Sequence, residues 1–216
     1  MKDIYLLSGL GADHRVLQDL DFSGYNITFI KWIQLIKNES IEDYAKRLTE
    51  QIITQNPIII GLSFGGIMAV EIGKLIDTER IILIASAKTK FEIPFYYSFA
   101  GSLGLHKLMP AKLMKQPNFI SNWLFGIESI NDKVLLASIL RDTDSKFLKW
   151  AIDKIVNWQN VIIPLNLKHI HGTADRILPY RFVSADVKVE KGGHFMTMNM
   201  VDELNREIRK ILNENL

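Results

Sequence analysis

The feature that most constrains this chain is a short apolar run that breaks into a glycine-flanked serine. Residues 58–60 are isoleucines, and Gly61 to Gly65 read Gly-Leu-Ser-Phe-Gly. A buried parallel strand has such a near-continuous apolar run, and residues 67–72 are compatible with a helix. A serine on a sharp turn between strand and helix needs a sparsely allowed backbone conformation, and glycines beside it let the two elements pack closely. The stretch therefore predicts a strand, a candidate nucleophile at Ser63, and a helix.

Apolar runs and helical patterns alternate along the rest of the chain. The helix that begins near Ser40 has its apolar residues at helical spacing, and so does the terminal helix after Met200. Further strands are expected at Ile4–Ser8, Tyr25–Trp32, Arg80–Ser86, Leu165–His171 and Asp186–Val189. This alternation is typical of an α/β fold whose parallel sheet has right-handed crossovers.

The alternation stops between residues 88 and 160, where no strand is expected. Helices are predicted there at Pro94–Leu105, Pro110–Lys115, Ile120–Phe125, Asp132–Arg141 and Lys146–Trp158, the last with Ser145 as its cap. We expect residues 1–87 and 161–216 to form the core, and residues 88–160 to form a helical cap over the carboxyl edge of the sheet. The aromatic and methionine side chains of the cap either pack between helices or line an apolar pocket.

Three residue types suited to nucleophilic catalysis follow predicted strands: Ser63, Asp175 and His194. The loops after parallel strands open at one edge of the sheet, where ligands bind. A serine hydroxyl is a poor nucleophile until a base, usually a histidine oriented by a carboxylate, removes its proton. Taken singly, each residue has another reading: Ser63 as a turn serine, Asp175 as a loop-capping carboxylate, and His194 as a helix cap. Their joint placement favours the catalytic interpretation.

The chain resembles the α/β-hydrolase superfamily over essentially its full length. The matching segments are Ser8-Gly9-Leu10-Gly11, Gly61 to Gly66, His171 to Pro179, which carries the pattern His-Gly-x-x-Asp-x-x-x-Pro, and Gly193-His194-Phe195. The order Ser, Asp, His is also that of α/β-hydrolases. The resemblance implies Ser63 as nucleophile, Asp175 as acid and His194 as base, with an oxyanion hole made by the backbone N–H groups of Leu10 and Phe64.

The chain departs from the family pattern in its first matching loop and at its N-terminus. The family usually opens that loop with His-Gly, whereas this chain has Ser8-Gly9; this changes the surroundings of the oxyanion hole without removing its donors. The chain also begins at what would be the family's third strand. We therefore expect an α/β-hydrolase fold trimmed to about six parallel strands flanked by helices, with the helical cap inserted.

The remaining histidines are expected to have structural roles. His171 is expected to order the loop that carries Asp175, and His169 to be a strand residue. His14 is expected to face solvent, and His106 to lie on the cap surface. The five histidines form no metal-binding spacing, and no nucleotide-binding glycine pattern is complete. No metal and no cofactor are therefore expected.

Composition excludes several other classes of protein. The 26 basic and 24 acidic residues are interleaved, which gives no electrostatic footprint for nucleic acid. Cysteine is absent, so disulfides and thiol chemistry are excluded. No stretch reaches the roughly 18 apolar residues of a membrane helix, and no signal peptide is evident. We expect a cytoplasmic protein, monomeric or homodimeric, without nucleic-acid or membrane partners.

The leading functional hypothesis is a serine hydrolase that acts on a small-molecule carboxylic ester or thioester through an acyl-serine intermediate. A lyase or proton-abstraction enzyme on the same scaffold is the alternative, because the sequence does not separate the two reactions. A non-enzymatic protein that binds a small ligand is a third reading. The side chains of the cap would select the substrate, and spacing alone does not identify it.

Overall fold

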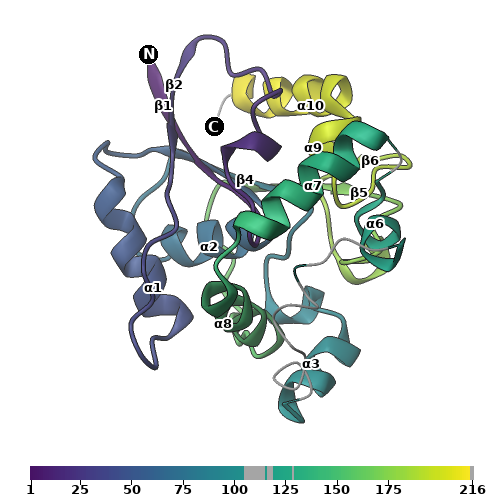
Figure 1. The fold of residues 1–216 in the computed structure, drawn as a ribbon. Helices are drawn as coiled ribbons and strands as arrows, with labels where there is room; N and C mark the ends of the chain where they lie inside the picture. Colours follow the sequence, from purple (N-terminus) through teal and green to yellow (C-terminus); the bar gives the residue numbers. More distant parts are fainter. Residues whose placement is uncertain (105–114, 116–118, 128, 215–216) are drawn as a thin grey trace.

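A single parallel sheet organises the chain (Figure 1). The computed structural model describes residues 1–104, 115, 119–127 and 129–214. Within them, six strands lie in the order β2-β1-β3-β4-β5-β6, and every neighbouring pair is parallel. Their bounds are β1 (Lys2–Leu7), β2 (Tyr25–Phe29), β3 (Ile58–Leu62), β4 (Arg80–Ile84), β5 (Leu167–Gly172) and β6 (Val187–Val189). The predicted six-stranded α/β-hydrolase architecture is confirmed.

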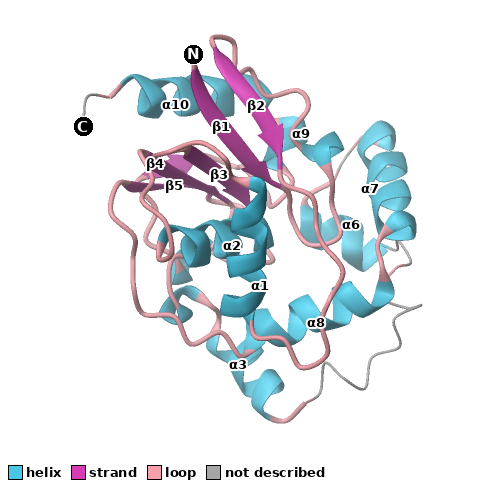
Figure 2. Ribbon diagram, turned by 90° about the vertical axis from the view of Figure 1, so that its left-hand side faces the viewer, coloured by secondary structure: helices cyan, strands magenta, loops and turns pink. Residues whose placement is uncertain are grey.

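Helices connect the strands and cover both faces of the sheet (Figure 2). The described helices are α1 (Ile41–Leu48), α2 (Phe64–Gly73), α3 (Phe95–Ser102), α6 (Phe119–Phe125), α7 (Ile130–Asp142), α8 (Ser145–Val156), α9 (Met196–Asn199) and α10 (Val201–Asn213). Short 3-10 helices lie at His14–Val16, Thr49–Gln51, Lys90–Glu92 and Tyr180–Phe182. No helix of the described part is both long and apolar enough to cross a membrane.

The two faces of the sheet bury separate apolar clusters, because successive strand side chains point to opposite faces. Ile4, Leu6 and Ile60 point into the cluster that α10 and α7 cover. Tyr5 and Ile59 point into the cluster that α1, α2 and α8 cover. Helices α7 and α8, from the region predicted as a cap, therefore each contribute side chains to a different core. Their connection crosses the end of the sheet near β1.

Several predicted boundaries are wrong by a few residues, for local reasons. The β2 strand ends at Phe29 rather than Trp32, and the Trp32 indole donates to the Ala12 carbonyl at 3.3 Å. The cap of α8 is Asp144, not Ser145: its carboxylate accepts the Phe147 N–H at 2.7 Å. The β1, β4, β5 and β6 ends also shift by one or two residues.

The helical prediction for residues 88–160 is confirmed where the structure describes them, and no strand lies among those residues. The boundaries differ: α3 ends at Ser102 and α7 begins at Ile130, capped by Ser129. The helix predicted at Pro110–Lys115 and the surface position predicted for His106 lie outside the described residues, apart from Lys115.

Candidate active site

Ser63 lies on a strained turn between β3 and α2. Its backbone has φ 53° and ψ −119°, a combination that costs a non-glycine residue of order 1–3 kcal/mol. Several hydrogen bonds hold the turn: the Ser63 N–H donates to the Ile84 carbonyl at 2.9 Å, and the Ser86 hydroxyl donates to the Ser63 carbonyl at 2.7 Å. The sheet thus maintains a conformation that presents the hydroxyl of Ser63 beyond the strand end.

The glycines on either side of Ser63 are required by close backbone packing. A Cβ on Gly61 would lie 2.4 Å from the Gly65 carbonyl oxygen, and a Cβ on Gly65 would lie 2.4 Å from the carbonyl oxygens of Leu7 and Ser8. Helix α2 therefore begins directly against the end of β1. This close approach explains the Gly-x-Ser-x-Gly spacing that the sequence displays.

The three predicted catalytic side chains form one hydrogen-bonded chain. His194 Nε2 lies 2.8 Å from Ser63 Oγ, and His194 Nδ1 lies 2.7 Å from Asp175 Oδ2. Because a carboxylate only accepts hydrogen bonds, the proton of neutral His194 belongs on Nδ1. Nε2 is then free to accept the serine proton. Residues distant in sequence thus meet at the carboxyl edge of the sheet.

The Asp175 carboxylate is buried and remains anionic. Burial acts to raise its pKa, but His194, through its charge and hydrogen bond, together with His171 and the Leu178 N–H, outweighs burial and holds the pKa below the ordinary value. Its other oxygen, Oδ1, accepts the N–H groups of Ile177 at 2.8 Å and Leu178 at 2.9 Å. Asp175 therefore caps its own loop and faces His194 with a fixed negative charge.

A pair of buried histidines lies behind this carboxylate. His171 Nε2 lies 2.8 Å from the Leu178 carbonyl, and its Nδ1 lies 3.1 Å from His169 Nε2. Burial lowers the pKa of both imidazoles, that of His169 well below its ordinary value, because a proton on His171 would repel one on His169 as well. Both are thus neutral at physiological pH. His171 joins the two ends of the Asp175 loop, as the sequence suggested.

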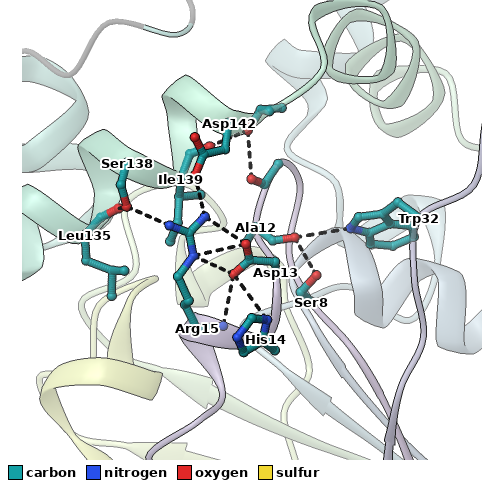
Figure 3. Close-up of polar contacts among 12 residues, drawn as sticks. Ser8, Ala12, Asp13, His14, Arg15, Trp32, Leu135, Ser138, Ile139 and Asp142 are labelled. Atoms are coloured by element: carbon teal, nitrogen blue, oxygen red, sulfur yellow. Dashed lines mark hydrogen bonds and ion pairs between the residues drawn. The ribbon is translucent and has the colours of Figure 1, made fainter.

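The loop after β1, residues Ser8–Asp13 and hereafter the β1 loop, lies beside Ser63. A Cβ on Gly9 would be 3.5 Å from Ser63 Cβ. The Ser8 hydroxyl donates to the Ala12 carbonyl at 2.6 Å, and the Trp32 indole donates to the same oxygen (Figure 3). Ser8 thus closes the β1 loop on itself.

The two predicted oxyanion-hole amides remain unpaired with protein acceptors. Among the described residues, neither the Leu10 nor the Phe64 N–H donates to a backbone or side-chain group. Phe64 opens α2, so its N–H is one of the four that a helix leaves without an internal partner. Both residues adjoin the Gly9–Ser63 contact. The amides are therefore available to an anionic oxygen near Ser63.

Apolar side chains surround this chemistry. The Phe125 ring of α6 lies edge-to-face on His194, with ring centres 5.9 Å apart. On the other side, Phe64 packs against Trp32 and Phe147, which belongs to α8.

His14 is exposed, with 62% of its side chain accessible, as predicted. In the described part of the chain, no three His, Asp or Glu side chains cluster as they would around a metal.

Two contacts of the site were not foreseen from the sequence. Trp32 was predicted to be a strand residue, and Thr143, which contacts the β1 loop, carried no signal. Both are contacts between segments distant in sequence, and no local pattern marks them.

Comparison with known proteins identifies the fold. No family model matches the sequence, and no curated protein matches it significantly. Solved structures do match: a hydrolase from Oleispira antarctica (TM-score 0.71, covering 99% of this chain and 92% of that one) and a bromoperoxidase from Bacillus anthracis (TM-score 0.72, with the same coverage). A thermophilic esterase from Thermogutta terrifontis matches with a TM-score of 0.73, over 98% of this chain and 89% of that one. Each is 14% identical to this chain, so the likeness establishes a shared fold.

Proposed function

We propose that this chain, which has the α/β-hydrolase fold, is a serine hydrolase that cleaves a carboxylic ester or thioester through an acyl-serine intermediate. The observation that carries the proposal is the hydrogen-bonded chain from Ser63 Oγ through His194 to Asp175, at 2.8 and 2.7 Å. Solved neighbours described as a hydrolase and an esterase share the fold and are consistent with this chemistry.

The first half-reaction acylates Ser63. As Ser63 Oγ attacks the substrate carbonyl carbon, its proton passes to His194 Nε2, and the carbonyl electron pair moves onto oxygen. The tetrahedral intermediate then collapses: the bond to the alcohol oxygen or thiol sulfur breaks, and His194 gives its proton to that leaving group. Asp175 stabilises the imidazolium that exists between these two transfers.

The second half-reaction restores the enzyme. A water molecule gives a proton to His194 Nε2 and attacks the acyl carbon, and the bond to Ser63 Oγ then breaks as that oxygen regains the proton. The carboxylic acid leaves. Through both halves, Asp175 keeps the imidazole in the tautomer that leaves Nε2 free for the next proton.

The developing oxyanion is proposed to lie between the Leu10 and Phe64 N–H groups. Their freedom from protein acceptors supports this role, and the positive end of the α2 dipole adds to it. Each such donor is worth about 2.7–4 kcal/mol in the transition state. Because the donors are backbone groups, the side chains of Leu10 and Phe64 act mainly through packing.

The substrate is proposed to be an uncharged, largely apolar ester or thioester. The Phe125 ring against His194 and the packing of Phe64 on Trp32 and Phe147 beside Ser63 support an apolar acyl or alcohol group. A panel of p-nitrophenyl esters and acyl thioesters of graded chain length would define it. The expected result is a preference for medium or long apolar acyl chains over charged ones.

Fluorophosphonate labelling tests the nucleophile. The probe should attach to the wild-type protein, with the modified peptide containing Ser63, and Ser63→Ala should abolish labelling. Ser102→Ala is the matched control, because among the described residues the exposed Ser102 hydroxyl bonds only the Phe99 carbonyl of its own helix; it should label as the wild type does. Labelling that persists in Ser63→Ala would overturn the assignment.

The other two functional hypotheses give different outcomes. A lyase would turn over without any trapped acyl adduct in rapid-quench mass spectrometry. A binding protein would hydrolyse no member of the panel while a ligand raised its melting temperature. Either result would replace the hydrolase proposal.

A further inference from the structure

Thr143, the residue that ends α7, reaches across to the β1 loop. Its hydroxyl lies 2.7 Å from the Gly11 carbonyl oxygen, and the residue is buried, with 6% of its surface exposed. Gly11 has φ +70°, and a Cβ there would lie 2.5 Å from Thr143 Oγ1. Loop and side chain thus fit closely, with no room for a larger residue at position 11.

The Thr143 hydroxyl has two possible acceptors but one proton. The Ile139 carbonyl also lies 2.7 Å away, yet it already accepts the Thr143 N–H at 3.1 Å. No other described residue donates to the Gly11 carbonyl. Since leaving a polar group near the interior unpaired is costly, the proton is best used toward Gly11.

The two glycines of the β1 loop contact different parts of the molecule. Gly9 faces Ser63, whereas Gly11 faces Thr143, and Leu10, with its proposed oxyanion-hole amide, lies between them. A cavity of about 550 Å³, lined by Gly11, Ala12, Trp32, Thr143 and Phe147 among others, borders the loop on the Gly11 side. Leu10 and Ala12 pack against the cores, whereas on the open side the Thr143 hydroxyl supplies the hydrogen bond to the Gly11 carbonyl.

A second polar connection fixes the end of α7 beside the same loop. The Arg15 guanidinium bonds both Asp13 oxygens, and it also donates to Ser138 and Asp142 of α7, each at 2.9 Å (Figure 3). Asp142 precedes Thr143. This ion-pair network therefore holds Thr143 beside Gly11.

We propose that Thr143 is a positioning residue for the oxyanion hole: its hydroxyl holds the Gly11 carbonyl, and thereby the loop segment that carries the Leu10 N–H two peptide units earlier, beside Ser63. The proposal depends on the hydrolase function proposed above. It assigns to the segment between α7 and α8 a role in stabilising the transition state rather than in enclosing substrate. The Leu10 N–H matters only when charge develops on the carbonyl oxygen, so its misplacement lowers kcat rather than raising KM.

The test compares Thr143→Val, which removes only the hydroxyl, with Thr143→Ser, which keeps it. Thr49→Val is the matched control: Thr49 also ends a helix, and within the described part of the chain its hydroxyl bonds only the Lys46 carbonyl of that helix. Hydrolysis of p-nitrophenyl butyrate is measured per active site, counted by complete fluorophosphonate labelling of Ser63. Counting active sites removes the effect of any unfolded fraction.

Thr143→Val should lower kcat by about 10- to 100-fold, the range expected for a misplaced catalytic group, with KM changed less than about twofold. Thr143→Ser should recover most of the rate, and Thr49→Val should match the wild type. An unchanged kcat in Thr143→Val, a pure rise in KM, or a Thr143→Ser variant as slow as Thr143→Val would overturn the proposal. If Thr143→Val does not fold, Thr143→Ala must show the same kcat loss.

Failure of the hydrolase proposal has a separate signature. In that case the wild-type protein itself would neither be labelled at Ser63 nor turn over the ester. A labelled, active wild type with an equally active Thr143→Val variant would reject the role of Thr143 alone.

Discussion

The two loops that flank Ser63 are held in place in different ways. In the loop after β5, residues Thr173–Pro179 and hereafter the β5 loop, short-range contacts orient the catalytic carboxylate, while the Tyr97 hydroxyl adds a distant contact by donating to the Ile177 carbonyl at 3.0 Å. Asp175 accepts two of the loop's own N–H groups, and His171, at the end of β5, contacts the Leu178 carbonyl. The β1 loop is closed internally by the Ser8 hydroxyl on the Ala12 carbonyl, and it is also connected to residues far away in sequence: Trp32 bonds Ala12, and Thr143 bonds Gly11.

The β5 loop orients the base, whereas the β1 loop is proposed to stabilise the oxyanion, so the two functions depend on different contacts. The base is oriented by residues within about twenty positions of one another, in a buried, low-dielectric site where a hydrogen bond to a charged group is strong. The proposed oxyanion donor at Leu10 depends on how α7 docks. Substitutions in the β5 loop should therefore disturb proton transfer, whereas those around the β1 loop should act through geometry.

The largest expected effect comes from Asp175→Asn in the β5 loop. An asparagine keeps an oxygen for the Ile177 and Leu178 N–H groups, but it favours the wrong tautomer of His194. We expect kcat on a p-nitrophenyl ester to fall by about 10⁴-fold, the loss this change causes in a serine protease triad, with little loss of folded protein.

Asp186→Asn is the control for that substitution. Asp186 also accepts a backbone N–H, that of His169 at 2.9 Å, but no contact joins it to His194 among the described residues. It should retain nearly full activity. Equal activity in the two variants would remove Asp175 from the proposed mechanism.

A smaller effect, on stability, is expected for Gly11→Ala in the β1 loop. The left-handed conformation at position 11 costs an alanine about 1–2 kcal/mol, and its methyl group would press on Thr143. Gly9→Ala is the internal comparison, because its methyl group meets only ordinary contacts; its unfolding free energy should stay within about 0.5 kcal/mol of wild type. Urea denaturation measures both. Equal stability of the two variants would argue against a tight Gly11–Thr143 fit.

A pH effect on stability near neutral pH should arise on the β5 side. His169 and His171 have lowered pKa values in the folded state, chiefly through burial. Below about pH 6.5, the ordinary histidine value, the unfolded chain binds protons that the folded chain excludes. Stability from these groups is therefore present above pH 6.5 and lost as pH falls, by up to about 1.4 kcal/mol per pH unit for each histidine.

Denaturation curves at pH 7.5 and 5.5 measure this loss. His169→Gln removes one titrating group, while the glutamine amide can still donate to His171. The unfolding free energy of this variant should therefore fall less between pH 7.5 and 5.5 than that of the wild type. His14→Gln is the control, because His14 is exposed; its loss should equal that of the wild type. A wild-type stability independent of pH over this range would contradict the buried neutral pair.

The same difference between short-range and long-range contacts explains which features could be predicted from the sequence. The turn at Ser63 and the loops carrying Asp175 and His194 follow directly from strand patterns, because a parallel sheet brings the ends of its strands to one edge. The fold and its six strands were predicted on that basis and are confirmed. The contacts of Trp32 and Thr143 could not be predicted, since they arise from how α7, α8 and the segment after β2 dock. Amphipathic spacing shows that a helix packs, but not against which carbonyl its last residue will lie.

The most direct test of the central claim, that Ser63, His194 and Asp175 act as one unit, is a double-mutant measurement of kcat on a p-nitrophenyl ester. Ser63→Ala and His194→Ala should each lower kcat by about 10⁶-fold, and the double variant should lose no more than either alone, as in a serine protease whose triad acts together. Losses that multiply in the double variant, or appreciable turnover by Ser63→Ala, would contradict the account.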